Sequence, residues 1–491
     1  MLVKTENQLS LAKHWINGEW IDSPDHLDSI NPATGEVIGQ YAFGTELEAG
    51  KAVQSALDAF NNADWKDNAP LRSKVLNAMA DLFEAREQDL VQMMGLENGK
   101  ILPEAGFEVA TVKSMLRYNA ALAMTYQGRA AEWKPGTFSM VIREAIGVAG
   151  LSVPWNSPVA LIFRSLASAL AAGCTAVVKM PGYTAHVNAL IAEIISETPG
   201  LPKGVVNIVT GEKEVLSYLV TSADVPVICF TGDTGTGRAI AAAGANQLKR
   251  FVLELGGKTP MIVFDDADLN VALPTIEKAL TVFAGQFCMT GSRLLVQRGI
   301  ADEVKAKLAE RLSNVKAGPS SDPQSDMGPL ISRSSVDRVD QMVQDAIQAG
   351  AEIIVRGGPV TEGKLAAGAF YRPTFLEVTD SSLAIFQQEV FGPVLTMQVF
   401  DTEEEAVALA NDSQFGLSAA IWSRDVDRPL RVARDIDAGT VWINTWALLI
   451  DGFEDGGYKQ SGQGRTRGIA GLEEFLETKH ILHDAGVIKK S

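Results

Sequence analysis

Three side chains stand in settings from which they could act on a carbonyl carbon: Cys288, Glu254 and Asn156. Cys288 lies in residues 283–293, a run with Gly, Gln and Thr between a predicted helix and a predicted strand. A cysteine attacks as a thiolate, and its attack creates an oxyanion that needs hydrogen-bond donors. Glu254 ends an apolar strand, where burial would raise its pKa and suit it to activate water as a general base. Asn156 opens a predicted helix and could donate its side-chain N–H to the oxyanion.

Each of these residues also has a purely structural interpretation. A lone cysteine is more often a packing residue, and we expect Cys174 and Cys229, which lie in apolar runs, to be core residues. Glu254 could form a buried ion pair, and Asn156 could cap a helix. None of the five histidines belongs to the runs around the three candidates, which disfavours a Cys–His dyad, and no Cys/His cluster has zinc spacing.

Three further stretches indicate a dinucleotide site. A strand at residues 227–230 runs into the glycine-rich residues 231–238 and then a helix, so backbone N–H groups could approach a pyrophosphate. The glycine spacing differs from the usual fingerprint and is equally typical of an ordinary tight turn. Lys179 ends another strand, where its ammonium could hold ribose hydroxyls or phosphate. Glu389 and Phe391 add a carboxylate and an aromatic ring before a Gly-Pro stop.

The elements that would position these residues alternate between strand and helix. The alternation runs through residues 146–255, with helices at 158–172 and 237–245, and resumes through residues 261–443. This order predicts two doubly wound parallel sheets, joined near Gly256, with a cleft between their strand ends.

Other segments are predicted to frame the two sheets. Residues 46–118 have the amphipathic pattern of a helical layer that serves as scaffold. Residues 15–20 form a hairpin around Asn-Gly, and residues 128–143 form a protruding hairpin around Pro-Gly. Residues 476–483 have the mixed pattern of an edge strand that could extend a neighbour's sheet.

Composition excludes several classes of function. With 491 residues the chain is expected to form at least two domains, and its net charge of −17 argues against nucleic acid and anionic membrane as partners. Residues 1–15 lack the apolar core of a secretory segment, and Gly and Pro interrupt the uncharged residues 145–163. Three cysteines fit a reducing compartment, so we expect a cytoplasmic protein.

The sequence resembles the aldehyde dehydrogenase superfamily over essentially its whole length. The motifs that carry the resemblance are Pro154-Trp155-Asn156, Val178-Lys179, Phe230-Thr231-Gly232 with Gly237, Leu253-Glu254-Leu255-Gly256-Gly257-Lys258, Gly285-Gln286-Phe287-Cys288, Glu389-Val390-Phe391-Gly392-Pro393, Asn411 to Leu417, and Gly456-Gly457-Tyr458-Lys459-Gln460-Ser461-Gly462. The resemblance implies an α/β fold with two doubly wound parallel-sheet domains and a small β oligomerisation element. The dinucleotide-binding, Rossmann-like domain would comprise residues 1–122 and 145–255, the catalytic domain 256–470, and the oligomerisation element 123–144 and 471–491. A homodimer or homotetramer is expected.

The resemblance also implies a mechanism. Cys288 would attack an aldehyde, Asn156 and the Cys288 backbone N–H would hold the oxyanion, and Glu254 would activate the water that hydrolyses the thioester left after hydride transfer to a nicotinamide. The implied cofactor-binding residues are Trp155, Lys179, Gly232, Asp233, Gly237, Leu255, Gly256, Glu389 and Phe391.

The sequence departs from the family pattern beside Lys179. Many members carry a glutamate three residues after this lysine, where it binds the adenosine ribose and favours NAD; the residue here is Gly182. Its absence makes NADP use possible, whereas the charge of Asp233 near the phosphate site opposes it. We expect NAD as the cofactor.

Similarity also outlines a substrate tunnel, lined by Leu161, Arg164, Phe287, Met289, Trp446, Leu448, Leu449 and Asp455. Its apolar and aromatic character favours a hydrophobic aldehyde, aliphatic or aromatic. Arg164 occupies a position that contacts the substrate carboxylate in semialdehyde dehydrogenases, but the second arginine of those enzymes is Val282 here. A semialdehyde is therefore the alternative substrate, unless Arg164 pairs with a protein carboxylate. Asp455 replaces a typical aromatic residue and makes the entrance more polar. A non-catalytic protein on the same fold and an acyltransferase to coenzyme A are the remaining alternatives.

Overall fold

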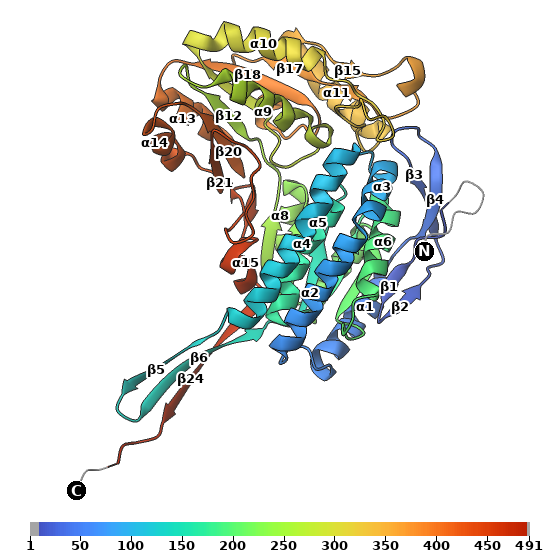
Figure 1. Ribbon diagram of the computed structural model, residues 1–491, viewed down its shortest axis with the longest axis vertical. Helices are drawn as coiled ribbons and strands as arrows, with labels where there is room; N and C mark the ends of the chain where they lie inside the picture. Colours follow the sequence, from blue (N-terminus) through green and yellow to red (C-terminus); the bar gives the residue numbers. More distant parts are fainter. Residues whose placement is uncertain (1–8, 489–491) are drawn as a thin grey trace.

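The computed structural model describes residues 9–488, which form two α/β lobes and a projecting arm (Figure 1). The ends of the predicted segments 1–122 and 471–491, namely residues 1–8 and 489–491, lie outside the described residues. None of the helices between residues 9 and 488 is long and apolar enough to cross a membrane.

The first lobe is built on an eight-stranded sheet with the order β2-β1-β9-β8-β7-β10-β11-β23. The five strands from β9 to β11 are parallel, and the strands at both edges are antiparallel. The strands are β1 (His14–Ile16), β2 (Glu19–Ile21), β7 (Val148–Ser152), β8 (Thr175–Met180), β9 (Val206–Thr210), β10 (Val227–Thr231), β11 (Arg250–Glu254) and β23 (Gly462–Gln463).

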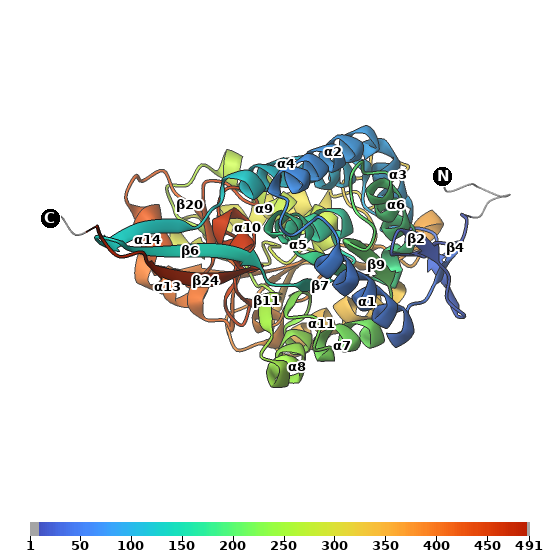
Figure 2. The same ribbon diagram turned by 90° about the horizontal axis from the view of Figure 1, so that it is seen from below.

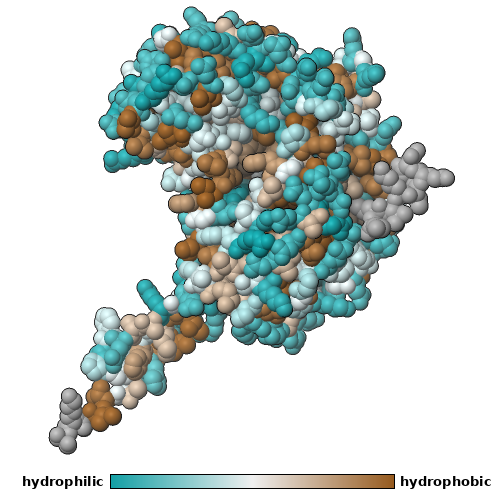
Figure 3. All heavy atoms as spheres, in the orientation of Figure 1, coloured by the Kyte–Doolittle hydropathy of each residue, from teal (hydrophilic) through white to brown (hydrophobic). Residues whose placement is uncertain are grey.

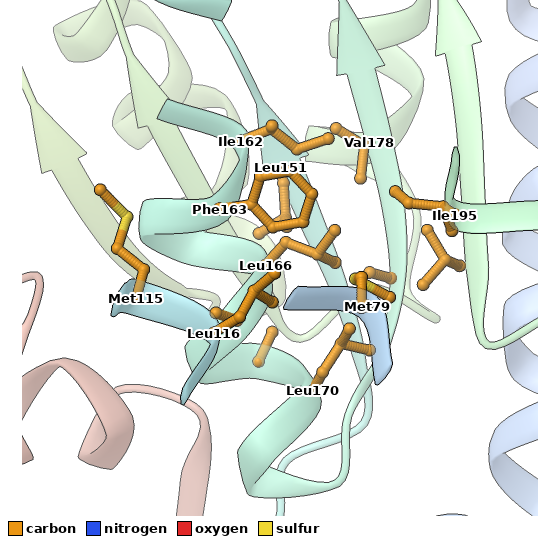
Figure 4. Packing of buried hydrophobic residues seen from close by; sticks show 14 of the residues in the cluster. Met79, Met115, Leu116, Leu151, Ile162, Phe163, Leu166, Leu170, Val178 and Ile195 are labelled. Atoms are coloured by element: carbon orange, nitrogen blue, oxygen red, sulfur yellow. The ribbon is translucent and has the colours of Figure 1, made fainter. Parts of the chain in front are cut away.

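Helices cover both faces of this sheet, because its central strands are buried on both sides. The helices are α1 (Glu46–Asn62), α2 (Ala69–Ala85), α3 (Glu87–Glu97), α4 (Leu102–Thr125), α5 (Pro158–Ala172), α6 (Ala185–Ser196), α7 (Lys213–Thr221) and α8 (Thr234–Gly244). Side chains of α2, α4, α5 and α6 pack on alternate residues of the strands, and those of α1, α7 and α8 pack on the others. Figure 4 shows Phe163 and Leu166 of α5 beside Leu151 and Val178 of the sheet.

The second lobe has a seven-stranded sheet with the order β14-β17-β18-β13-β12-β20-β21, parallel except at β14. Its strands are β12 (Pro260–Val263), β13 (Arg293–Gln297), β14 (Glu352–Val355), β17 (Thr374–Glu377), β18 (Val394–Phe400), β20 (Ser418–Trp422) and β21 (Thr440–Ile443). Helices α9 (Leu269–Thr281) and α10 (Ala301–Ser313) pack on one face. Helices α11 (Arg333–Gln348), α12 (Ala384–Gln387), α13 (Glu403–Asn411) and α14 (Arg428–Asp435) pack on the other.

The arm is an antiparallel sheet of β24 (Leu476–Asp484), β6 (Thr137–Ala145) and β5 (Arg129–Lys134). It leaves the first lobe beside the short helix α15 (Gly468–Glu473), as the views in Figures 1 and 2 agree. The predicted edge strand at residues 476–483 therefore pairs with β6 of its own chain.

The predicted α/β class with two doubly wound sheets is confirmed. The Asn17-Gly18 hairpin is also present, with both residues at positive φ. The expected start of α8 was wrong. The helix begins at Thr234 instead of Gly237, because the Asp233 side chain caps it by accepting the N–H of Thr236 at 2.6 Å. Strands β17 and β18 were not predicted. The domain boundaries stay a prediction, since β23 lies within residues 256–470 yet pairs with β11.

Candidate active site

Cys288 follows a tightly bent segment between α9 and β13. Phe283 and Ala284 have φ values of 52° and 54°, and Gly285 has 73°, so three consecutive residues are left-handed. Such backbone is strained for residues other than glycine and persists only where surrounding contacts hold it. A Cβ at Gly285 would lie 2.4 Å from the carbonyl carbon of Gly392, so the position accepts only glycine. The cysteine itself is half-buried.

Asn156 lies directly against this loop. Its Nδ2 donates to the carbonyl oxygen of Gln286 at 3.1 Å, two residues before Cys288. Gln286 in turn accepts the N–H of Ile331 with its side-chain oxygen and donates to the carbonyl of Phe283. Asn156 is buried and precedes α5, but its side chain does not cap that helix. The structural alternative for Asn156, a helix cap, is therefore wrong.

Glu254 ends β11 and is buried with the guanidinium of Arg164 from α5. Glu254 Oε2 is 3.4 Å from Arg164 Nη1, and Arg164 Nη2 donates to Thr231 Oγ1 at 2.7 Å. Burial raises the pKa of Glu254 to about 7; Arg164 opposes the rise and the nearby Asp455 adds to it. Glu254 Oε1 and both carboxylate oxygens of Asp455 have no hydrogen-bond partner within residues 9–488. A buried carboxylate with one oxygen free and such a pKa can accept a proton near neutral pH.

The pKa of the Cys288 thiol depends on its burial and on the charges around it. Burial raises the pKa of the Cys288 thiol to about 12, and the charges close enough to influence it belong to Arg164, Glu389, Glu254 and Asp455. Cys288 is therefore neutral at rest, and its attack on a carbonyl requires a base that removes the proton.

Two acids of α4 that the sequence did not place in the site hold the segments around it: Glu104 holds the loop of residues 283–292 (the nucleophile loop), and Glu108 holds the start of α5. Glu104 accepts the N–H of Phe283 at 3.0 Å and pairs with Lys278 at 2.7 Å. Glu108 pairs with the buried Lys100 and accepts the N–H groups of Val159 and Ala160 at the start of α5. The signal in the sequence was two glutamates at positions on the apolar face of an amphipathic helix, where an unpaired charge is costly.

A small cavity of about 10 Å³ lies among these groups, lined in part by Lys100, Glu104, Asn156, Phe283 and Gln286. It has room for about one water molecule.

The predicted cofactor residues line the carboxyl ends of the first sheet and the facing edge of the second lobe. Lys179 Nζ is 3.5 Å from Glu212 Oε2, and burial lowers the pKa of Lys179. Glu389 accepts the N–H of Gly257 at 3.2 Å, and burial raises its pKa to about 7. The rings of Trp155 and Phe391 meet edge to face, with centroids 5.5 Å apart.

The glycine-rich turn after β10 lies beside these groups. The side chain of Leu255 covers Gly237, where a Cβ would be 2.6 Å from Leu255 Cδ2, and Glu389 approaches Gly256 equally closely. Gly232 donates its N–H to the carbonyl of Glu254, and Asp233 caps α8. Lys179, Glu389 and the N-terminus of α8 supply an ammonium, a carboxylate and backbone N–H groups. These are the chemical groups that bind the ribose and phosphates of a dinucleotide, so this set fits such a cofactor.

The predicted tunnel residues differ in their burial and in their partners. Phe287 and Trp446 meet edge to face at 5.8 Å and, with Leu449, border the second-lobe core beside Cys288. Met289 and Asp455 are buried, and Leu161 is half-buried against the first-lobe core. Leu448 is 62% exposed. Arg164 pairs with Glu254 as described, which answers whether it has a protein partner.

An α/β protein with two doubly wound lobes and a strained cysteine loop between them defines a class of enzyme fold, and comparisons with known proteins identify it. The sequence profile described as the aldehyde dehydrogenase family matches residues 20–481. This chain therefore belongs to the aldehyde dehydrogenase family.

Its relatives include proteins with different substrates. The chain is 38% identical over 472 residues to betaine aldehyde dehydrogenase from Bacillus subtilis, covering 95% of this chain and 96% of that protein. It is 38% identical over 474 residues to the mitochondrial succinate-semialdehyde dehydrogenase of Arabidopsis thaliana, covering 95% and 88%. Its fold is similar to a crystal structure of betaine aldehyde dehydrogenase from Staphylococcus aureus in complex with NAD+, with a TM-score of 0.94, 36% identity, and coverage of 97% and 96%.

Proposed function

We propose that this protein oxidises an aldehyde to the carboxylic acid with NAD+, through a covalent thiohemiacetal and thioester on Cys288. The observation that carries the proposal is the meeting of three groups at one loop. Asn156 donates to the backbone two residues before Cys288, and Glu254 lies close enough to influence the thiol electrostatically. Nucleophile, oxyanion donor and base are the parts that acyl transfer through a cysteine requires.

The residues would act in sequence. The thiol of Cys288 loses its proton to a base and its sulfur bonds to the aldehyde carbon, while the Asn156 amide and the Cys288 backbone N–H hold the resulting oxyanion. The former aldehyde carbon would then lose its hydrogen as hydride, for which bound NAD+ would be the acceptor, and a thioester would remain on Cys288. Glu254 then takes a proton from the water that attacks the thioester, the carbon–sulfur bond breaks, and the acid is released. Arg164 limits the rise of the pKa of Glu254, so the carboxylate remains available near pH 7.

The assignment of NAD+ rests on the donor set beside β8 and β10 and on the bound NAD+ of the Staphylococcus aureus relative. Lys179 and Glu389 would hold the ribose hydroxyls, and the N-terminus of α8, with Gly232 and Gly237, would face the pyrophosphate. Trp155, Asp233, Leu255, Gly256 and Phe391 complete the proposed cofactor surface.

A hydrophobic aldehyde is the proposed substrate. Phe287, Trp446 and Leu449 give the mouth beside Cys288 an apolar and aromatic surface. The alternative, a semialdehyde held by Arg164 as in the Arabidopsis relative's named activity, has less support. Both Nη atoms of Arg164 are engaged, by Glu254 and Thr231, and its Nε has no hydrogen-bond partner among residues 9–488. A substrate carboxylate that bound two nitrogens of this guanidinium would therefore compete with Glu254 or Thr231.

An aldehyde panel tests the function and the substrate class together. Octanal, benzaldehyde, succinic semialdehyde and betaine aldehyde are each mixed with NAD+ or NADP+, and NADH or NADPH formation is followed by absorbance. We expect kcat/KM to be highest for octanal or benzaldehyde with NAD+, and Cys288→Ala to be inactive. No turnover with any aldehyde would refute the proposal. Acceleration by coenzyme A with acyl-thioester as product would favour the acyltransferase alternative.

The arm is the proposed oligomerisation element, for a homodimer or homotetramer. Hydrophobic residues lie among hydrophilic ones along it in Figure 3, and its exposed side chains include Trp133, which is 81% exposed, and Leu482, which is 62% exposed. We also propose a cytoplasmic location and the division into a cofactor domain, 1–122 and 145–255, a catalytic domain, 256–470, and the arm segments 123–144 and 471–491.

A further inference from the structure

Glu212, which the sequence did not place in the cofactor site, brings a carboxylate beside Lys179. Glu212 follows β9, next to the carboxyl end of β8. Its Oε2 is 3.5 Å from Lys179 Nζ, and its Oε1 accepts the backbone N–H of Gly182 at 3.0 Å. The side chain of Glu212 is nevertheless 49% exposed, whereas that of Lys179 is 10% exposed. Each carboxylate oxygen contacts one protein donor, and the exposed half of the side chain can still meet a ligand.

Position 182 has no room for a glutamate side chain. A Cβ at Gly182 would lie 2.2 Å from the hydroxyl oxygen of Tyr41, which belongs to β4 (Val37–Ala42). Tyr41 is buried, and burial raises its pKa to about 12 with a further contribution from Glu212, so the hydroxyl stays neutral. The tyrosine therefore occupies the space that a side chain at position 182 would need. The negative charge beside Lys179 comes instead from Glu212, which follows β9.

The chemistry of this arrangement suits an adenosine ribose. A carboxylate accepts hydrogen bonds from the two hydroxyls of a ribose and repels a phosphate at the 2′ position. We propose that Glu212, held by Lys179 and Gly182, is the residue by which this chain binds the adenosine ribose and selects NAD+ over NADP+. The inference rests on the proposed function, since it assigns a specificity residue to the same cofactor site.

Direct binding tests the inference without turnover. NADH and NADPH, and the half-ligands 5′-AMP and 2′,5′-ADP, are titrated into the full-length native protein and its variants by calorimetry, with no aldehyde present. Glu212→Gln keeps an oxygen that can accept the Gly182 N–H but loses the charge. We expect its preference for NADH over NADPH to fall by about tenfold, the effect of one charge-assisted hydrogen bond, with the same change for the half-ligands.

Two further variants separate recognition from general effects of charge. Glu214→Gln removes an equal charge from an exposed residue two positions along, in the first turn of α7, and should leave the preference unchanged. Glu212→Asp keeps the charge and should retain the preference for NADH. An unchanged preference in Glu212→Gln, or an equal change in Glu214→Gln, would overturn the inference while leaving the proposed function intact. A native protein that binds neither dinucleotide would overturn both.

Discussion

Two Lys–Glu pairs, each with one member in α4, differ in burial and allow a test of how much a buried ion pair contributes to stability. The side chains of Lys100 and Glu108 are 3% and 1% exposed. Those of Lys113 and Glu84 are 42% and 48% exposed. Removing one partner of a buried pair leaves the other charge unpaired and lowers the free energy of unfolding by about 3–5 kcal/mol, whereas an exposed pair contributes about 0–1 kcal/mol to it.

We therefore expect Glu108→Ala to lower the free energy of unfolding by at least about 2 kcal/mol more than Glu84→Ala does. Glu108→Ala leaves the Lys100 ammonium without its partner and removes the acceptor of two N–H groups at the start of α5. The loss is a large share of a typical stability of about 5–15 kcal/mol, so the alanine variant could fail to accumulate. Glu108→Gln keeps the oxygen acceptor and should fall between the two alanine variants.

The assay is denaturation by urea at one fixed protein concentration, because subunit association changes apparent stability. Midpoints and slopes of the native protein and the three variants are compared by tryptophan fluorescence. Equal losses in Glu108→Ala and Glu84→Ala would refute the reasoning, since burial would then have no effect on the cost of an unpaired lysine.

Three other predictions concern the chemistry at Cys288. Hydrolysis of the thioester should accelerate as pH rises through about 7, because only the ionised form of Glu254 accepts a proton. In Glu254→Gln this hydrolysis should be slow and insensitive to pH. Rapid-quench kinetics that showed a native-like pH dependence in this variant would contradict the assignment. Asp455→Asn should move this pH dependence to lower pH, because loss of a like charge stabilises the carboxylate of Glu254; a shift to higher pH in the same assay would show the opposite interaction. Asn156→Ala should lower kcat by about 10²–10³-fold while calorimetry shows unchanged NADH binding, and an unchanged kcat would remove Asn156 from the oxyanion site.

Local patterns predicted the framework well, because the signals that specify it lie within single segments. Pro at the first position and Gly just after the last one set the limits of α5 at the predicted residues 158–172. Continuous apolar runs predicted the central strands, because these strands are buried on both faces. The start of α8 was misplaced because its glycine-rich beginning resembles a loop, and only the cap by Asp233 reveals that the helix already includes these residues.

The candidate site was harder to predict where it depends on contacts between distant segments. Glu104 and Glu108 belong to a helix that looks like scaffold, and their roles depend on Phe283 and on the start of α5. Glu212 gives no local sign that it lies beside Lys179, because the two residues meet only when β8 and β9 pair. A pattern within one segment cannot report such a meeting.

The nucleophile loop is held from both lobes, and this makes the site sensitive to how the lobes are joined. From the first lobe, Glu104 holds the N–H of Phe283 and Asn156 holds the carbonyl of Gln286. From the second lobe, Ile331 donates to the Gln286 side chain, and Gly392 packs against Gly285. The strained left-handed turn persists because these contacts fix it from opposite sides. A change that shifts one lobe against the other would therefore move the thiol relative to Asn156 and Glu254, even when none of the three residues is altered.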